Sequence, residues 1–264
     1  MFKHETQVIK FLLQWYSMNA RKLPWRKKNN LNLPHPYFVF VSEYMLQQTT
    51  VNTVKNKFNE FILKWPSLNK LAQTSEPNIL KFWSGLGYYS RARNLLKSAK
   101  IIKNNFKNNI PQTYDELIQL PGIGDYTAKA ILGIGYNKSV MPLDANIERI
   151  LVRLHAIDKP INKVKNKLKD LGKKFISDKY SSNLIQSFMD YGSEICLPRN
   201  PKCNICGINK FCQSYKKNLQ QKIPFKQKKK SNKPIKYTRA YVIVNEKNEI
   251  LVRSRPCLLY TSPS

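Results

Sequence analysis

The sequence is poor in acidic residues and has no long hydrophobic run. Its 264 residues include 16 aspartates and glutamates against 46 lysines and arginines, which gives a formal net charge of +30. Such a charge attracts polyanions, and nucleic acid is the obvious candidate, with an acidic membrane surface as the competitor. No apolar stretch approaches the length that spans a bilayer, so the composition argues against a membrane protein.

The sequence also lacks the pattern of a secretory leader. The apolar patch at residues 11–13 is interrupted by Gln14, and no small-residue cleavage site follows it. We therefore expect a cytoplasmic protein in a reducing compartment, where clustered cysteines bind metals rather than form disulfides. The chain is long enough for one large or two modest domains.

Strand-like alternation is scarce before residue 215, whereas helical spacing recurs. Residues 5–17 predict an amphipathic helix that buries Val8, Phe11, Leu12, Trp15 and Tyr16. This recurrence of helical spacing predicts a mainly α fold.

Local signals place three further helices. Thr113 and Glu116 form a capping box that opens a short helix ending at Leu120. Asp125 is positioned to cap a helix over Tyr126–Ile134, and another helix begins near Asp144.

The composition changes after residue 220. Residues 221–237 are rich in lysine and contain prolines, which predicts a basic linker. Residues 241–244 and 250–252 predict two strands, which alone are marginally stable in water. Residues 238–264 therefore read as the beginning of a β-containing domain that the sequence does not complete, and the final segment, 257–264, does not continue its pattern.

Four of the five cysteines are clustered with the spacing C-x6-C-x2-C-x5-C. Soft thiolates gathered this closely predict a four-sulfur site for zinc or for an iron–sulfur cluster. Zinc sites usually contain two close pairs, and here only one pair is close. Disulfides and unrelated core cysteines are the minor alternatives. The candidate metal ligands are Cys196, Cys203, Cys206 and Cys212.

The turn Leu120–Gly124 joins two short predicted helices. Gly122 and Gly124 would let backbone amides approach a phosphate, and the second helix offers its N-terminus to the same anion. A plain interhelical turn is the alternative. In a chain with a charge of +30, capped helices on both sides favour binding to the DNA backbone.

Two acidic residues, Glu43 and Asp144, also have ordinary structural interpretations. Glu43 reads as a first-turn acid favoured by the helix dipole, and Asp144 reads as an N-cap. Taken separately, these interpretations are favoured over catalysis. The motifs around both residues change that balance.

The chain resembles the MutY-type adenine DNA glycosylases of the helix-hairpin-helix superfamily. The motifs of that family occur in order at residues 21–26, 42–49, 85–94, 120–128 and 143–149, followed by the cysteine pattern. The resemblance covers roughly residues 5–215, and it favours a [4Fe–4S] cluster over zinc.

The resemblance further implies a two-lobed all-α catalytic domain over residues 1–220. A helical-barrel lobe would span about 31–140, and a cluster lobe would combine about 1–30 with 141–220. The last residues, 238–264, would be a truncated Nudix-like fragment.

The resemblance also implies a reaction. A monomer would remove adenine that is mispaired with 8-oxoguanine or guanine in double-stranded DNA, after extruding the base. Glu43 would be the general acid that protonates adenine N7, which requires a raised pKa. Asp144 would stay ionised and stabilise the cationic sugar, as paired carboxyl groups do in glycosidic chemistry generally. Tyr126 and Asn146 would orient and stabilise that sugar.

Seven further positions match residues that contact the target DNA in that family. Arg21, Trp25, Leu46 and Gln186 would surround the extruded adenine, although core packing is an equal alternative for Trp25 and Leu46. The remaining three would enter the duplex and hold the distorted mispair: Gln47, Gln48 and Tyr88.

An endonuclease III-like glycosylase and AP lyase acting on oxidised pyrimidines is the alternative enzyme. That type resembles this chain in fold and cluster, but it has a lysine at the position of Tyr126, and a phenol cannot form its imine. Lys129 is expected to face solvent or a phosphate. We therefore predict a monofunctional glycosylase. Two non-catalytic interpretations also stay open: an iron–sulfur DNA-binding module and a zinc-stapled structural protein.

Overall fold

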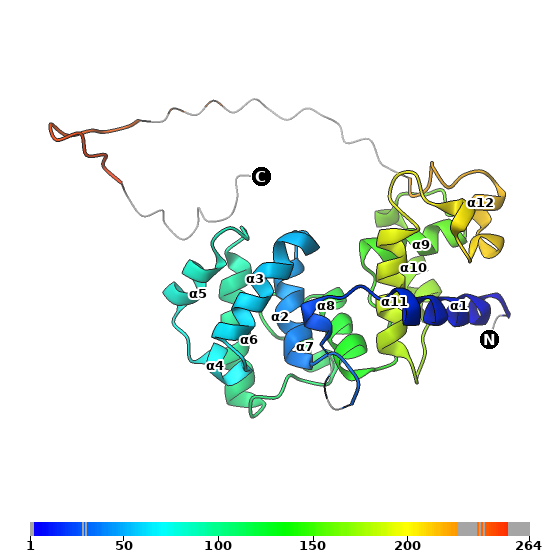
Figure 1. Cartoon of the computed structure of the whole chain (residues 1–264), viewed down its shortest axis with the longest axis horizontal. Helices are drawn as coiled ribbons and strands as arrows, with labels where there is room; N and C mark the ends of the chain where they lie inside the picture. The colour runs from blue at the N-terminus through cyan, green and yellow to red at the C-terminus, as the bar shows by residue number, and fades with distance from the viewer. Residues whose placement is uncertain are drawn as a thin grey trace.

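The computed structural model describes residues 3–27, 29, 31–225, 237, 239 and 241–252. In this part the chain is helical almost throughout, which confirms the predicted mainly α class. Figure 1 shows the helices gathered in two groups that meet near the centre of the molecule. In the described part, no helix combines the length and apolarity needed to cross a bilayer.

The first group consists of α2 to α8 and the π-helical turn η2 (Figure 1). α6 packs against α2, α4 and α5, while η2 packs against α2 and α8. Buried aromatic side chains fill its centre, Trp83 and Phe40 among them. The bounds are α2 Pro36–Leu46, α3 Val51–Lys64, α4 Leu68–Ala72, α5 Glu76–Trp83, α6 Ser90–Asn105, α7 Tyr114–Ile118, α8 Asp125–Ala130 and η2 Ile131–Gly135.

The second group brings the N-terminal helix against the C-terminal helices. α11 packs against α1 and α9, and it also contacts η2, so it joins the two groups. α10 and α12 pack on α9. The bounds are α1 Lys3–Asn19, α9 Ala145–Leu154, α10 Lys165–Lys173, α11 Ser181–Glu194 and α12 Gln213–Lys216, with short 3-10 turns at Pro24–Arg26, Ile161–Lys163, Cys203–Ile205 and Asn209–Phe211.

The predicted caps largely hold. α1 covers the helix predicted over 5–17. Thr113 caps α7: its hydroxyl oxygen accepts from the Glu116 amide (3.4 Å) and its hydroxyl donates to the Glu116 carboxylate (2.6 Å). The helix ends at Ile118, two residues before the predicted Leu120, because a turn already leads into the glycine hairpin.

The prediction for Asp125 is wrong in detail. Gly124 is the N-cap of α8, and Asp125 is the first helical residue. Its carboxylate instead accepts from the Tyr114 hydroxyl (3.0 Å) and pairs with Lys129 (2.8 Å). The side chain therefore ties α7 to α8 rather than capping the helix.

The helix predicted over Tyr126–Ile134 is also interrupted, because it changes to π geometry after Ala130. Two glycines allow close contact here. A Cβ on Gly133 would lie 2.2 Å from Ile185 of α11, and a Cβ on Gly135 would lie 3.2 Å from the backbone of Pro36 in α2. The change to π geometry thus occurs at the point where α11 and α2 come closest to the backbone of this helix.

Glu43 lies near the end of α2 and not in its first turn. The helix begins earlier than expected, with His35 as its N-cap and Pro36 as its first residue. The first-turn interpretation of this acid is therefore wrong, and the helix dipole gives it no stabilisation.

The C-terminal strands are reduced to a minimal hairpin. Val244 and Ile250 form a single antiparallel bridge, closed by a turn at Asn245. Within the described residues 241–252 no longer strand forms, and the apolar side chains there are exposed. Most of the predicted linker and all of residues 257–264 lie outside the described residues, so the Nudix-like fragment stays a prediction.

Candidate active site

A cleft lies where the two helix groups meet, and it has a volume of about 390 Å³. Its walls come from α2, α8, η2, α9 and α11, together with the segment before α2. The structure brings together nine of the side chains predicted for the site: Arg21, Trp25, Glu43, Leu46, Gln47, Tyr126, Asp144, Asn146 and Gln186.

Glu43 is 6 % exposed, and its carboxyl group interacts with the Tyr126 hydroxyl and with Asp144, the other acidic residue that lines the cleft. Burial raises the pKa of Glu43 to about 7, a hydrogen bond from the Tyr126 hydroxyl lowers it, and the charge of Asp144 raises it. A carboxyl group with this pKa carries its proton in a large fraction of molecules at neutral pH.

Asp144 has several more partners than Glu43. It caps α9 by accepting from the Ile147 amide (2.7 Å), and it also accepts from the Asn146 side chain (2.7 Å). Burial raises the pKa of Asp144, while these hydrogen bonds and the charge of Arg149 lower it. The predicted N-cap is confirmed, and the same residue lines the cleft.

Arg149 fixes the side chain of Asn146 from the other side, donating to its Oδ1 (2.9 Å). The same guanidinium donates to the carbonyls of Gly192 (2.6 Å) and Cys196 (2.7 Å). The amide of Asn146 therefore has its nitrogen toward Asp144 and its oxygen toward Arg149. Sequence reasoning missed Arg149, although an arginine on the apolar face of a helix is itself a signal.

Gln186 is buried in the wall of the cleft with a fixed amide orientation. Its Nε2 donates to the carbonyl and the hydroxyl oxygen of Ser182 (3.1 and 3.2 Å). The Ser182 hydroxyl donates to the Ile134 carbonyl (2.8 Å). The Ser182 hydroxyl oxygen and the Ser182 carbonyl can therefore only accept from the Gln186 amide. The Gln186 Oε1 has no partner within the described chain.

Trp25 and Leu46 both pack in or against the core and also line the cleft. Trp25 is buried and packs edge-on against Phe58, with ring centroids 5.5 Å apart. Both residues nevertheless contribute to the lining of the cleft.

Gln48 and Tyr88 lie outside the cleft and are exposed. Both have positive φ angles, 55° and 46°. Gln47 connects their region to the glycine hairpin, because its Nε2 donates to the Gly122 carbonyl (3.2 Å).

The two hairpin glycines differ. Gly122 has a φ of 81°, and a Cβ there would lie 2.9 Å from the Asn94 side chain. Gly124 has a φ of −105°, and a Cβ there would meet no atom within 4 Å. Only Gly122 therefore requires glycine within the protein itself.

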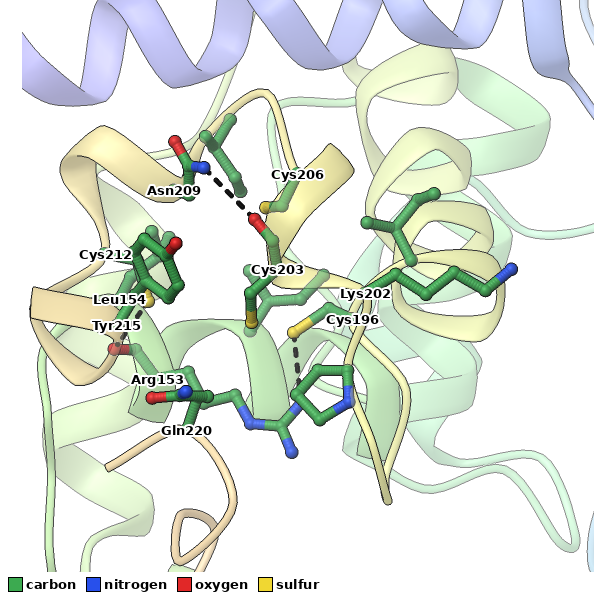
Figure 2. A pocket seen from close by; sticks show the side chains of 14 residues that line it. Arg153, Leu154, Cys196, Lys202, Cys203, Cys206, Asn209, Cys212, Tyr215 and Gln220 are labelled. Carbon is green, nitrogen blue, oxygen red and sulfur yellow. Dashed lines mark hydrogen bonds between the residues drawn. The ribbon is translucent and has the colours of Figure 1, made fainter. Parts of the chain in front are cut away.

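The four clustered cysteines are free thiols that line one pocket, shown in Figure 2. Most of the other lining is apolar, including Ile150 and Leu154 of α9. Two of the sulfurs accept hydrogen bonds: Cys196 from Arg153 (3.3 Å) and Cys206 from the Tyr191 hydroxyl (3.2 Å). Such bonds are typical of the surroundings of iron–sulfur clusters.

The arrangement of these thiols bears on the choice between zinc and iron. No three histidine, cysteine, aspartate or glutamate side chains in the described part are placed to hold one metal ion. A single zinc needs four sulfurs around one point, whereas a four-iron cluster takes one thiolate at each iron, with the sulfurs farther apart. Four cysteine thiols around one pocket suit such a cluster, with one thiolate for each iron.

Comparison with known proteins identifies the family. Residues 41–174 match the HhH-GPD superfamily of base excision DNA repair proteins. An adenine DNA glycosylase from Buchnera aphidicola subsp. Baizongia pistaciae is 42 % identical over 247 residues, which cover 92 % of this chain and 68 % of the relative. The chain belongs to the adenine DNA glycosylases.

More distant relatives agree with this assignment. Adenine DNA glycosylase from Homo sapiens is 34 % identical over 232 residues, covering 84 % of this chain but 42 % of the human protein. The chain thus spans well under half of that relative. The enzyme class predicted from the sequence, an adenine-specific DNA N-glycosylase, is confirmed through this family.

Solved structures support the same fold. A thermostable thymine-DNA glycosylase matches with a TM-score of 0.73 and 26 % identity, over 81 % of this chain and 98 % of that one. Endonuclease III in a trapped covalent complex with DNA matches with a TM-score of 0.66 at 18 % identity, over 83 % of this chain and 100 % of that one, which shows a shared fold.

Sequence reasoning also missed an ionic cluster behind the wall of the glycosylase cleft, where Arg21 and Arg26 line the cleft and bind a buried acid. Asp190 of α11 is 0 % exposed and accepts from two arginines of the segment before α2. Arg26 binds it through both terminal nitrogens (2.6 and 2.8 Å), and Arg21 binds it through Nε (2.5 Å). An acid on the inward face of a helix was the available signal, and its partners fix the predicted Arg21 in the wall.

Lys129 does not line the cleft of this glycosylase. Its ammonium group pairs with Asp125 on the same helix, and its side chain is partly exposed. The expectation of a solvated or phosphate-facing lysine agrees with this position.

Proposed function

We propose that the chain hydrolyses the N-glycosidic bond of adenine mispaired with 8-oxoguanine or guanine in double-stranded DNA, without cleaving the strand. The main support is the pair of carboxyl groups in one cleft. Glu43 has few partners and a pKa of about 7, whereas Asp144 accepts hydrogen bonds that favour its charged form. A proton donor and a fixed negative charge are thereby available together.

The reaction follows from these two groups. The mispaired adenine leaves the stack and enters the cleft, at a cost that is lowest for a mismatch. The Glu43 carboxyl gives its proton to adenine N7, the bond between C1′ and N9 breaks, and its electron pair moves into the purine, which leaves neutral. The Asp144 carboxylate stabilises the cationic sugar until water adds to C1′ and gives a proton to the Glu43 carboxylate, which restores the acid.

Tyr126 and Asn146 act on the same sugar. Tyr126 donates to Glu43, and Asn146 holds the Asp144 carboxylate in position. A phenol cannot form an imine with the opened sugar, so Tyr126 supports a monofunctional enzyme. Lys129 is held by Asp125, away from the residues that line the cleft.

Recognition is divided between the cleft and the exposed loops. We assign the extruded adenine to Arg21, Trp25, Leu46 and Gln186, whose ring, apolar wall and polar groups suit a purine. Gln47, Gln48 and Tyr88 would enter the duplex. The hairpin with Gly122 and Gly124 would bind a phosphate through its amides, at the N-terminus of α8.

We assign the four cysteines to a [4Fe–4S] cluster, which would take one thiolate at each iron and so hold the segment 196–212 together. Purified protein should then contain four irons and four sulfides and absorb visible light. Stoichiometric zinc in a colourless sample would contradict this assignment.

We also propose the domain division given above: a catalytic domain over 1–220, with lobes of about 31–140 and of 1–30 with 141–220, then a linker over 221–237 and a Nudix-like fragment over 238–264. The two helix groups in Figure 1 support the two lobes. The enzyme would act as a cytoplasmic monomer on the chromosome.

One assay tests the proposed reaction. Under single-turnover conditions, the protein is mixed with duplexes that carry adenine opposite 8-oxoguanine, guanine, cytosine or thymine, with and without alkali. We expect strand breaks only after alkali, and only for the first two duplexes. Breaks without alkali, or a DNA adduct trapped by borohydride, would favour the endonuclease III-like alternative, and no base release at all would refute both.

A further inference from the structure

One buried arginine outside the cleft connects several backbone segments. Arg91 lies in the first turn of α6 and is 5 % exposed. Its Nη1 donates to the carbonyls of Tyr44 (3.2 Å), Met45 (2.7 Å) and Gln47 (2.5 Å). Its Nη2 donates to those of Leu86 (2.8 Å) and Gly87 (3.0 Å).

The charge of Arg91 is stabilised by backbone rather than by an acid. Burial lowers the pKa of Arg91, and the nearby Tyr88 hydroxyl raises it. In the described part of the chain, no carboxylate pairs with it. The last carbonyls of α2 lie at the negative end of the helix dipole, so they stabilise the buried positive charge of Arg91.

The five carbonyls belong to two separate segments, the end of α2 with its C-cap and the loop before α6. Tyr44, Met45 and Gln47 mark the end of α2 and the start of the loop with Gln48, whereas Leu86 and Gly87 precede Tyr88. Each loop carries an exposed residue in left-handed geometry, Gln48 or Tyr88, a conformation that a non-glycine residue adopts at a cost. The guanidinium lies between the loops and holds both.

We propose that Arg91 is a positioning residue that fixes these two loops as one rigid unit, so that Gln48 and Tyr88 enter the duplex together and extrude the target base. The unit is attached to the end of α2, the helix that carries Glu43. The proposal rests on the proposed function, because it assumes that adenine must leave the stack before it is cleaved.

The Arg91→Lys variant tests this role. A lysine keeps the charge, but its compact ammonium group cannot reach both loops as a planar fork does. Base release is measured under single turnover on two duplexes: one with adenine opposite 8-oxoguanine, and one with adenine opposite an abasic analogue, where it has no pairing partner. We expect the rate constant to fall by about 10- to 100-fold on the paired duplex, and by much less on the other.

The control is Leu96→Ala, which removes a buried side chain from the same helix and leaves the five hydrogen bonds of Arg91 in place. It should lower the melting temperature while leaving the ratio of the two rate constants unchanged. An Arg91→Lys variant that loses equal activity on both duplexes, or on neither, would overturn the proposal. Wild-type protein without activity on any duplex would instead refute the proposed function.

A double-mutant cycle tests the same role when Arg91→Lys is poorly folded at higher temperature. Arg91→Lys is combined with Gln48→Ala and Tyr88→Ala, and the rates are measured at a temperature where all variants are folded. If Arg91 acts through the two loop residues, its substitution adds little in their absence. Fully additive losses would show that Arg91 acts elsewhere and would contradict the proposal.

Discussion

The two carboxyl groups of the cleft, to which we assign the catalytic roles, differ in the hydrogen-bond partners that surround them. Glu43 and Asp144 are both buried, and both pKa values are raised by that burial. Asp144 accepts from Ile147 and Asn146 and lies near Arg149, so its charged form has compensating partners. Glu43 has mainly the Tyr126 hydroxyl as a hydrogen-bond partner, so burial dominates and favours its protonated form.

The rate of base release should therefore fall at both high and low pH. Above about pH 7 the Glu43 proton is lost, so we expect the single-turnover rate constant to fall about tenfold per pH unit. At low pH the rate should fall again as Asp144 becomes protonated. Rates on a saturating A:8-oxoguanine duplex from pH 5 to 9 check this, and a rate that is still flat at pH 9 would contradict an acid role for Glu43.

Glu43 should also lower the stability of the folded protein at alkaline pH. Its pKa rises from an ordinary 4.5 to about 7 on folding, so stability is lost as the pH rises through this window. Glu43→Gln, which cannot ionise, should exceed wild type by up to about 3 kcal/mol at pH 8 and match it near pH 4. Urea unfolding of both proteins at the two pH values measures this difference. The same variant should have no base-release activity.

Replacing the acid of the ionic cluster, Asp190, should destabilise the protein, whereas Glu43→Gln should stabilise it at pH 8. Asp190→Asn leaves Arg26 and Arg21 without their carboxylate, and a broken buried ion pair costs about 3–5 kcal/mol. We expect a lower free energy of unfolding and weaker discrimination among purines. Asp178→Asn is the matched control, because Asp178 is an exposed carboxylate on the surface. It should change neither the free energy of unfolding nor the discrimination among purines. Equal effects of both substitutions would contradict a special role for this cluster.

At the scale of elements, the helix-hairpin-helix turn offers a pair of matched glycine substitutions. Gly122→Ala places a Cβ at a φ of 81° and 2.9 Å from Asn94, so it should destabilise the fold by about 1–3 kcal/mol. Gly124→Ala meets no protein atom within 4 Å and should cost at most about 1 kcal/mol.

The same pair separates folding from phosphate binding. If the hairpin amides approach a phosphate as proposed, the Gly124→Ala methyl should weaken DNA binding although the free protein stays stable. Thermal unfolding and fluorescence anisotropy with a duplex measure the two effects. Unchanged affinity for Gly124→Ala would argue that this hairpin is a plain turn.

Elements with local signals were predictable from the sequence, and those set by distant contacts were not. The capping pair Thr113 and Glu116 and the apolar face of α1 are encoded within a few residues. The π turn after Ala130 depends on contacts of Gly133 and Gly135 with α11 and α2, which no local pattern reveals. The site shows the same division, since Asp190 acquires its role from arginines 164 and 169 residues away.

At the scale of the whole molecule, motif order located the cleft better than residue chemistry alone did. Glu43 and Asp144 each had an ordinary interpretation, and only the surrounding motifs brought them together before the structure did. That reasoning missed buried arginines such as Arg91 and Arg149, although the place of Arg149 on the apolar face of its helix was a signal. Their partners are mostly backbone carbonyls, which leave no mark in the sequence.

The net charge of +30 leads to a prediction for the whole molecule. Each phosphate neutralised by a lysine or arginine releases counterions, so affinity for DNA should fall steeply with salt. With about 6–10 phosphate contacts, the affinity would drop by about 10³- to 10⁵-fold between 50 and 200 mM salt. The rate constant of base release at saturating protein should barely change over this range, because Glu43 and Asp144 are buried. Binding by anisotropy and single-turnover rates across the same salt series check both halves, and an affinity indifferent to salt would show that the positive charge serves another purpose than holding the duplex.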